Sequence, residues 1–216
     1  MPQLTRGGGM ITIEQARALY EGSDSVHDFA HVLRVLRLAE KLARMEGADL
    51  EIVRTAALLH DISRSEDEEA GAEAEEETDH ALIAAREARR ILDGADPAFI
   101  DAVAHAIEAH RFRNSIEPQT IEAKVLFDAD KLDAIGAGGV ARAFAYGALL
   151  GQPLWGEVSE GYIPGQSDEA HTPHHEFHFK LKTIKDRLYT ESGRQIAEGR
   201  HRFMEMFYEQ MAAEVR

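Results

Sequence analysis

The sequence predicts an all-α protein, and two observations support this fold class. Apolar residues recur at spacings of three and four along nearly every segment, as on one face of an α-helix, and no convincing alternating strand pattern is present. Several segments also begin with a capping residue or with a proline at the first helical position. With 216 residues, of which 44% are hydrophobic, the chain can bury one sizeable core. We therefore expect a single-domain helical bundle with a C-terminal helical elaboration.

The expected helices follow one another along the whole chain. The glycine-rich run 136–139 follows no strand, so it is not expected to be a dinucleotide-binding loop but to end one helix and begin the next. Four helices begin with a signal for the first turn: Thr12 with Gln15, Asp96 before Pro97, Thr172 before Pro173, and Ser192 with Gln195. The expected helices cover residues 12–21, 27–47, 50–63, 79–93, 97–110, 119–135, 138–149, 173–190 and 193–213.

Two segments and the N-terminus lack a helical pattern. Residues 1–10 are expected to form a flexible tail, and residues 11–216 one domain whose core covers about 26–135. Segment 66–79 holds nine acidic and no basic residues, which predicts a solvated loop or a frayed helix rather than a cation site. Segment 151–167, rich in Gly and Pro, is the other irregular part.

The composition of the chain restricts its expected partners and metal ligands. The chain has 24 Lys and Arg against 39 Asp and Glu, a formal net charge of −15, and no run rich in Lys or Arg. Because nucleic acids and anionic membranes are bound through basic patches, we expect neither as a partner. The absence of cysteine fits a reducing cytoplasm and leaves His and carboxylates as metal ligands. No apolar run approaches the roughly 18 residues of a membrane span, and the first residues lack the apolar part of a secretory signal, so a cytoplasmic protein is expected.

Four polar side chains fall on helix faces that should be buried. They are His31 in segment 27–47, the pair His60 and Asp61 after an apolar run, and Asp130 in segment 119–135. Burying two carboxylates without compensating charge costs several kcal/mol, so a divalent cation is the simplest partner. Two imidazoles and two carboxylates leave open positions on Mn²⁺, Mg²⁺, Co²⁺, Ni²⁺, Fe²⁺ or Zn²⁺. Open positions favour a catalytic over a structural metal site.

The order and spacing of these residues resemble the HD-domain superfamily of metal-dependent phosphohydrolases, whose pattern is a His, a His-Asp pair and a distant Asp. The matching runs are His27–Val35, Ala57–Ile62 and Asp128–Ala137, and similarity continues through residues 142–147 and 185–186 to 200–204. The chain is most similar to small stand-alone bacterial members, some of which cleave nucleoside triphosphates to a monophosphate and pyrophosphate. The resemblance implies four metal ligands, namely His31, His60, Asp61 and Asp130.

The resemblance implies a divalent-metal-dependent phosphohydrolase acting on a nucleotide or a related small phosphate ester. A cation of this kind lowers the pKa of a bound water for in-line attack on phosphorus. The residues expected to take part in catalysis are Asp61, His80, His110 and Lys131. The residues expected to contact substrate are Arg64, Arg111, Asp133, Arg142, Tyr146 and Lys180.

Alternatives remain for the number of ions and for the activity. One ion per chain is expected, because His105 and His110 stand about 140° apart around a helix and cannot easily share an ion. Some related helical folds carry additional histidines and act as dinuclear iron oxygenases, so this activity is one alternative. A second alternative is a nucleotide-binding module without catalytic activity. The four histidines at 171, 174, 175 and 178 have chelating spacing, but they are expected to lie on a solvated helix start.

Overall fold

The computed structural model describes residues 11–20, 29–62, 79–112, 115–163 and 165–215. Over these ranges the regular elements are helices and no strand occurs, so the all-α prediction is confirmed. Among the described residues, no helix is both long and apolar enough to cross a membrane. The predicted tail 1–10, Arg64, and residues 66–78 of the acidic segment lie outside the described residues.

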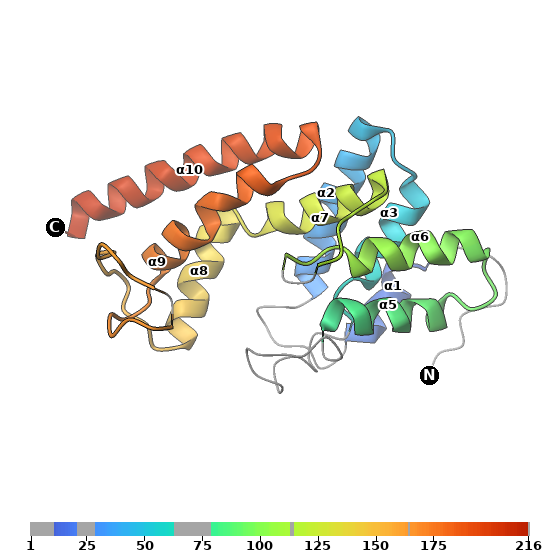
Figure 1. The fold of residues 1–216 in the computed structure, drawn as a ribbon, viewed down its shortest axis with the longest axis horizontal. Coiled ribbons are helices and arrows are strands. Elements are labelled where there is room, and N and C mark those ends of the chain that lie inside the picture. The colour runs from blue at the N-terminus through green and yellow to red at the C-terminus, as the bar shows by residue number, and fades with distance from the viewer. Residues whose placement is uncertain (1–10, 21–28, 63–78, 113–114, 164, 216) are drawn as a thin grey trace. The chain divides into compact units, whose positions relative to one another are not determined.

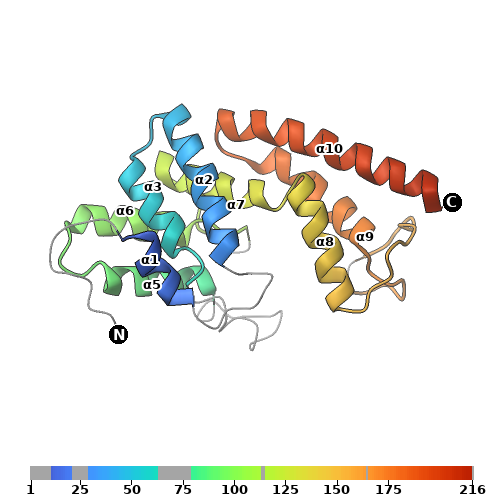
Figure 2. The same cartoon turned by 180° about the vertical axis from the view of Figure 1, so that it is seen from behind.

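The chain divides into two compact units, residues 1–130 and 131–216. Helix α3 is central to the first unit, where it packs against α2 and α6 and also contacts α1 and α5. Helices α5 and α6 run side by side in Figure 1, and α2 lies beside α3 in Figure 2. The helices of this unit are α1 (Ile13–Arg17), η1 (Ala18–Tyr20), α2 (Phe29–Glu46), α3 (Leu50–Leu59), α5 (His80–Ile91), α6 (Pro97–Glu108) and α7 (Ile121–Asp133), whose last turn crosses into the second unit.

The second unit is built from α8 (Ala137–Leu149), α9 (Pro173–Phe179), the 3₁₀ helix η3 (Leu181–Arg187) and α10 (Glu191–Val215). Helix α10 packs against η3 and α8, and α9 packs against α8 and η3. The expected break after α7 is present, since Gly136 adopts a φ of +82° directly before α8. Only glycine takes this conformation without strain, which is why the chain can turn sharply here.

Three of the four predicted helix starts are confirmed. Thr12 and Gln15 form a reciprocal capping box, and Asp96 and Thr172 cap helices that begin with proline. The fourth is wrong. Helix α10 begins at Glu191, and the Oγ1 of Thr190 accepts the Gly193 N–H at 3.0 Å, so Ser192 lies inside the first turn.

Two expected helices end early. Segment 50–63 stops being helical after Leu59, which places His60 and Asp61 in a turn. Segment 173–190 is α9 followed by the 3₁₀ helix η3 rather than one continuous α-helix. The first difference places the two site residues just beyond the regular helix, although His60 itself keeps a right-handed helical conformation, with φ −64° and ψ −30°.

Candidate metal centre

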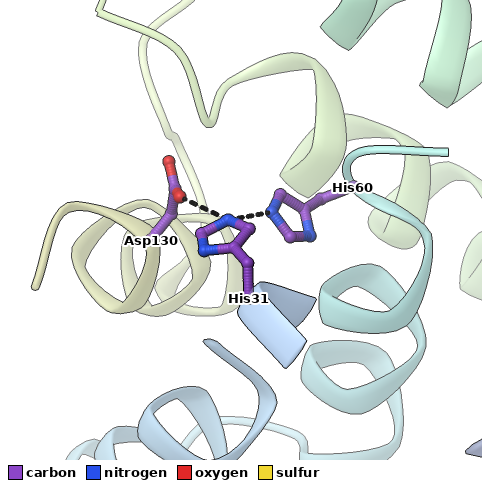
Figure 3. Close-up of side chains that lie close together, drawn as sticks. All are labelled: His31, His60 and Asp130. Atoms are coloured by element: carbon purple, nitrogen blue, oxygen red, sulfur yellow. Dashed lines mark hydrogen bonds and ion pairs between the residues drawn. The ribbon is translucent and has the colours of Figure 1, made fainter. Parts of the chain in front are cut away.

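Three predicted metal ligands meet within the first unit. His31 comes from α2, His60 from the turn after α3, and Asp130 from α7 (Figure 3). The Nε2 of His31 lies 3.3 Å from an oxygen of Asp130 and 3.4 Å from the Nε2 of His60. Both imidazoles are buried, and the Asp130 side chain is 14% exposed. These three side chains form a group that could hold a metal ion.

Asp61 stands between two pairs of histidines. Its Oδ2 lies 3.6 Å from the Nε2 atoms of both His31 and His60. Its Oδ1 lies 3.6 Å from the Nε2 of His80 and 3.7 Å from that of His110. Asp61, His80 and His110 are all buried and form a second group that could hold an ion. One carboxylate thus faces four imidazole nitrogens.

Backbone carbonyls orient two of these imidazoles. The Nδ1 of His60 donates to the Ala57 carbonyl at 2.9 Å, and the Nδ1 of His110 donates to the Ile107 carbonyl at 2.6 Å. Because a carbonyl can only accept, the proton of each neutral ring is on Nδ1, and the lone pair is on Nε2, toward the carboxylates. Burial is the main reason that the pKa of His60 falls to about 4, so this ring is neutral near pH 7.

The donor set fits a divalent cation. Two ligand atoms bound to one ion at about 2.0 to 2.2 Å lie roughly 3.0 to 3.6 Å apart in tetrahedral or octahedral geometry. The separations of His31 from Asp130, His60 and Asp61, and that of His60 from Asp61, fall between 3.3 and 3.6 Å. Imidazole nitrogen and carboxylate oxygen suit Mn²⁺, Fe²⁺, Co²⁺, Ni²⁺ and Zn²⁺, and fixed Nδ1 hydrogen bonds are typical of ligating histidines.

The sequence analysis missed an ion pair beside this centre. An oxygen of Asp79 accepts the Ala81 N–H at 2.8 Å, which caps α5, and lies 3.2 Å from an Arg111 nitrogen. Partial burial by itself raises the pKa of Asp79, but the capping hydrogen bond and the Arg111 guanidinium together hold this pKa below its ordinary value. Arg111, expected to contact substrate, therefore has a carboxylate partner within the protein. A capping Asp directly before His80 is visible in the sequence, but its long-range pairing with Arg111 is not.

Lys131, predicted to take part in catalysis, and four predicted substrate contacts lie in the second unit, whereas Arg64 is outside the described residues. Lys131 directly follows Asp130 in α7. Buried Asp133 is 3.2 Å from a nitrogen of Arg142, so these two residues pair with each other. Tyr146 is half exposed on α8, and exposed Lys180 is 2.7 Å from Glu176.

Three other histidines, His105, His174 and His175, lie outside the two donor groups and make contacts of their own. His105 accepts the Gln119 N–H on its Nε2 at 3.0 Å and belongs to neither group of donors. The expectation of a solvated helix start was wrong for His174 and His175, which are buried. His175 lies 2.5 Å from Glu169, and its other nitrogen lies 2.7 Å from the Thr172 hydroxyl.

A family model described as "HD domain" matches residues 28–135, which include all six residues of the two donor groups. The chain belongs to the HD-domain family. YpgQ of Bacillus subtilis, described as an uncharacterized protein, is 34% identical over 203 residues, which cover 92% of this chain and 89% of YpgQ.

Solved structures of other family members are also similar. The crystal structure of Bacillus subtilis YpgQ in complex with ADP matches with a TM-score of 0.70 and 32% identity, covering 94% of this chain and 98% of that chain. A predicted HD superfamily hydrolase from an uncultured Thermotogales bacterium matches with a TM-score of 0.65 and 30% identity, covering 94% and 91%. Ribonuclease Y of Chloroflexus aurantiacus is 37% identical over 122 residues, which cover 56% of this chain but only 21% of that protein.

Proposed function

We propose that this HD-domain protein is a divalent-metal-dependent phosphohydrolase acting on a nucleotide or a related small phosphate ester. The observation that carries the proposal is the convergence of buried carboxylates and imidazoles, with Asp61 between two pairs of Nε2 atoms. Two relatives support the hydrolase activity and the nucleotide ligand in this proposal. One solved structure with 30% identity is described as a predicted hydrolase, and YpgQ was crystallised with ADP.

In this proposal His31, His60, Asp61 and Asp130 hold the cation. When bound, the cation polarises a phosphate oxygen and acidifies a water molecule. Asp61 Oδ2 would be the oxygen available to this cation, because it lies 3.6 Å from the Nε2 atoms of both His31 and His60, whereas Oδ1 faces His80 and His110. A water held beside this oxygen would attack phosphorus as the P–O bond to the leaving group breaks. A histidine Nε2 would accept the water proton, and the leaving oxygen would depart as an alcohol or a phosphate that takes up a proton. His110 suits this step, because its Nδ1 is already committed as a donor to Ile107.

The charge of the chain supports the proposed substrate class. A surface of net charge −15 repels polyanions, so phosphate groups have to be held by a bound cation and by local basic groups such as Lys131. A small nucleotide fits this requirement better than a nucleic acid, whose binding requires a broad basic surface. The likeness to ribonuclease Y is confined to a fifth of that protein and therefore supports the HD domain alone.

Two substitutions test the proposal directly. We expect His60→Ala and Asp130→Ala each to reduce cation binding and nucleotide hydrolysis by at least about 100-fold, while helical circular dichroism persists. The measurements are calorimetric titration with Mn²⁺ and direct identification of products from nucleoside mono-, di- and triphosphates and cyclic dinucleotides with Mn²⁺, Mg²⁺, Co²⁺ and Ni²⁺.

Matched controls come from α6. His105 is a histidine outside both donor groups, and Asp101 is exposed. His105→Ala and Asp101→Ala should therefore retain cation binding and turnover. Full activity of His60→Ala in the presence of a chelator would show the assignment to be wrong, and tight nucleotide binding without turnover under every cation would favour a binding module.

One observation favours a second arrangement of ions. Asp61, His80 and His110 form their own donor group, so Asp61 could be shared between two cations instead of one. His80 and His110 would then be ligands rather than proton acceptors. Metal analysis decides between one and two ions per chain. Two irons per chain together with oxygen consumption would favour a dinuclear oxygenase over a hydrolase.

A further inference from the structure

His80 and His110 both lie at helix ends, where the helix by itself holds a side chain less firmly in place than in its interior. His80 is the first residue of α5, and His110 lies in the turn that follows the end of α6 at Glu108. Helix ends fray more readily than helix interiors, because their backbone groups lack partners within the helix. The ring centroids of these histidines are nevertheless 5.5 Å apart, and both Nε2 atoms face the same oxygen of Asp61.

The ion pair between Asp79 and Arg111 joins these two ends. Asp79 immediately precedes His80, and Arg111 immediately follows His110. Their side chains are 13% and 18% exposed, and the Asp79 oxygen that faces Arg111 also accepts the first-turn N–H of Ala81. A single carboxylate oxygen therefore fixes the start of α5 and the turn after α6 at once.

We propose that the Asp79–Arg111 ion pair positions His80 and His110 against Asp61, so that Arg111 acts on the site through Asp79 rather than by binding substrate. The activity part of this inference rests on the proposed function, whereas the positioning part does not. It holds whether the two histidines accept a proton or bind a cation, because both roles require their Nε2 atoms at Asp61.

The charges of the pair can be removed without removing the cap. Asn is as good a capping residue as Asp, so Asp79→Asn keeps the hydrogen bond to Ala81 and removes the charge. Arg111→Gln removes the other partner and leaves a partly buried carboxylate without its guanidinium. A second ion pair between α5 and α6 gives matched controls, because Arg89 binds Asp101 on the exposed surface of the same two helices.

The kinetic test compares the two single variants with their double variant. We expect D79N and R111Q each to lower kcat by about 10- to 100-fold while KM stays within twofold of the wild type. Because both substitutions break the same ion pair, the double variant should be no less active than the less active of the two single variants. Arg89→Gln and Asp101→Asn should leave kcat and KM unchanged. A rise in KM confined to R111Q, or a kcat within twofold of the wild type in both single variants, would overturn the proposal.

A second readout needs no activity. In metal-free protein, imidazole ¹H–¹⁵N spectra should show shifted His80 and His110 signals in D79N and R111Q, with little change at His105 and no change in the control variants. Unchanged His80 and His110 signals in both variants overturn the proposal. If the wild-type protein hydrolyses no nucleotide, the proposed function fails, and these spectra still decide whether the ion pair positions the histidines.

Discussion

At the scale of single residues, the position of each polar group decides which protonation state it favours. Asp61 is buried among four imidazoles, and the ring of His60 is kept neutral by its burial. A neutral ring with its proton on Nδ1 offers its lone pair to a cation, whereas a protonated ring would repel one. The residue types were evident in the sequence, but which ring nitrogen faces the carboxylates follows from the hydrogen bonds that His60 and His110 donate to the carbonyls of Ala57 and Ile107.

The histidines of the second unit should make its stability depend on pH. The Nε2 of His178 is 3.1 Å from that of His174, and its Nδ1 is 3.2 Å from the Lys182 ammonium nitrogen. Burial first, and then the charge of Lys182 and the neighbouring His174 and His175, lower the pKa of His178 below 6.5. Lys182 donates to Nδ1, so the neutral ring donates from Nε2 to His174.

The sign of the effect follows from proton uptake. Because the folded state disfavours protonated His178, the unfolded chain binds more protons once the pH falls below about 6.5. The stabilisation is complete above that pH and is lost as the pH falls toward the lowered pKa. We expect the free energy of unfolding, measured with a denaturant, to decrease as the pH is lowered from 7.5 to 5. In His178→Gln the dependence of this free energy on pH should be weaker, by an amount that corresponds to at most about one bound proton.

Lys182→Met serves as the companion variant, since it keeps His178 but removes the nearby charge. It should raise the pKa of His178 and reduce the same slope in part. If both variants unfold with the wild-type pH dependence, the hydrogen-bonded pair of histidines does not govern stability in this range.

At the scale of helices, two neighbouring glycines in the first turn of α8 differ in what surrounds them. A Cβ atom added to Gly139 would lie 2.2 Å from the Ala134 carbonyl oxygen, whereas one added to the neighbouring Gly138 meets open space. The Ala134 oxygen belongs to the backbone and cannot swing aside as a side chain would.

This contrast gives a matched pair of substitutions. We expect Gly139→Ala to destabilise the protein by about 3 kcal/mol or more, because the backbone has to shift. Gly138→Ala should be neutral or stabilise by roughly 0.5 to 1 kcal/mol, because alanine loses less conformational entropy in a helix. Chemical unfolding of both variants measures the difference. Equal stabilities would show that the turn before α8 is not tightly packed.

Helix identities were predictable from the sequence because they follow from repeating apolar faces and local caps. Thr12 and Asp96 cap as expected, since their partners lie within three residues. Thr190 replaces Ser192 as the cap of α10, and the apolar pattern does not distinguish two hydroxyl residues two positions apart. The approach of His80 and His110 to Asp61 was not predictable in the same way. It depends on turns and on the long-range pairing of Asp79 with Arg111.

At the scale of the whole molecule, the proposed function requires an acidic chain to bind an anionic substrate. The net charge of −15 disfavours that encounter, and a cation held as proposed by His31, His60, Asp61 and Asp130 would reverse the sign locally. The same buried carboxylates cost folding free energy in the absence of positive charge. Cation binding and stability are therefore linked, and the linkage can be measured on the intact chain.

We expect divalent cations to raise the thermal midpoint of the whole protein. A ligand that binds only the folded state stabilises by about 2.7 kcal/mol at 100 times its Kd, which corresponds to a shift of roughly 5 to 10 °C for a chain of this size. Scanning calorimetry with Mn²⁺ after removal of metal by a chelator measures the shift. His60→Ala and Asp130→Ala should lose most of it, whereas His105→Ala should keep it. Since cations also bind loosely to acidic surfaces, an equal shift in all of these proteins would assign the stabilisation to surface charge instead of to the buried centre.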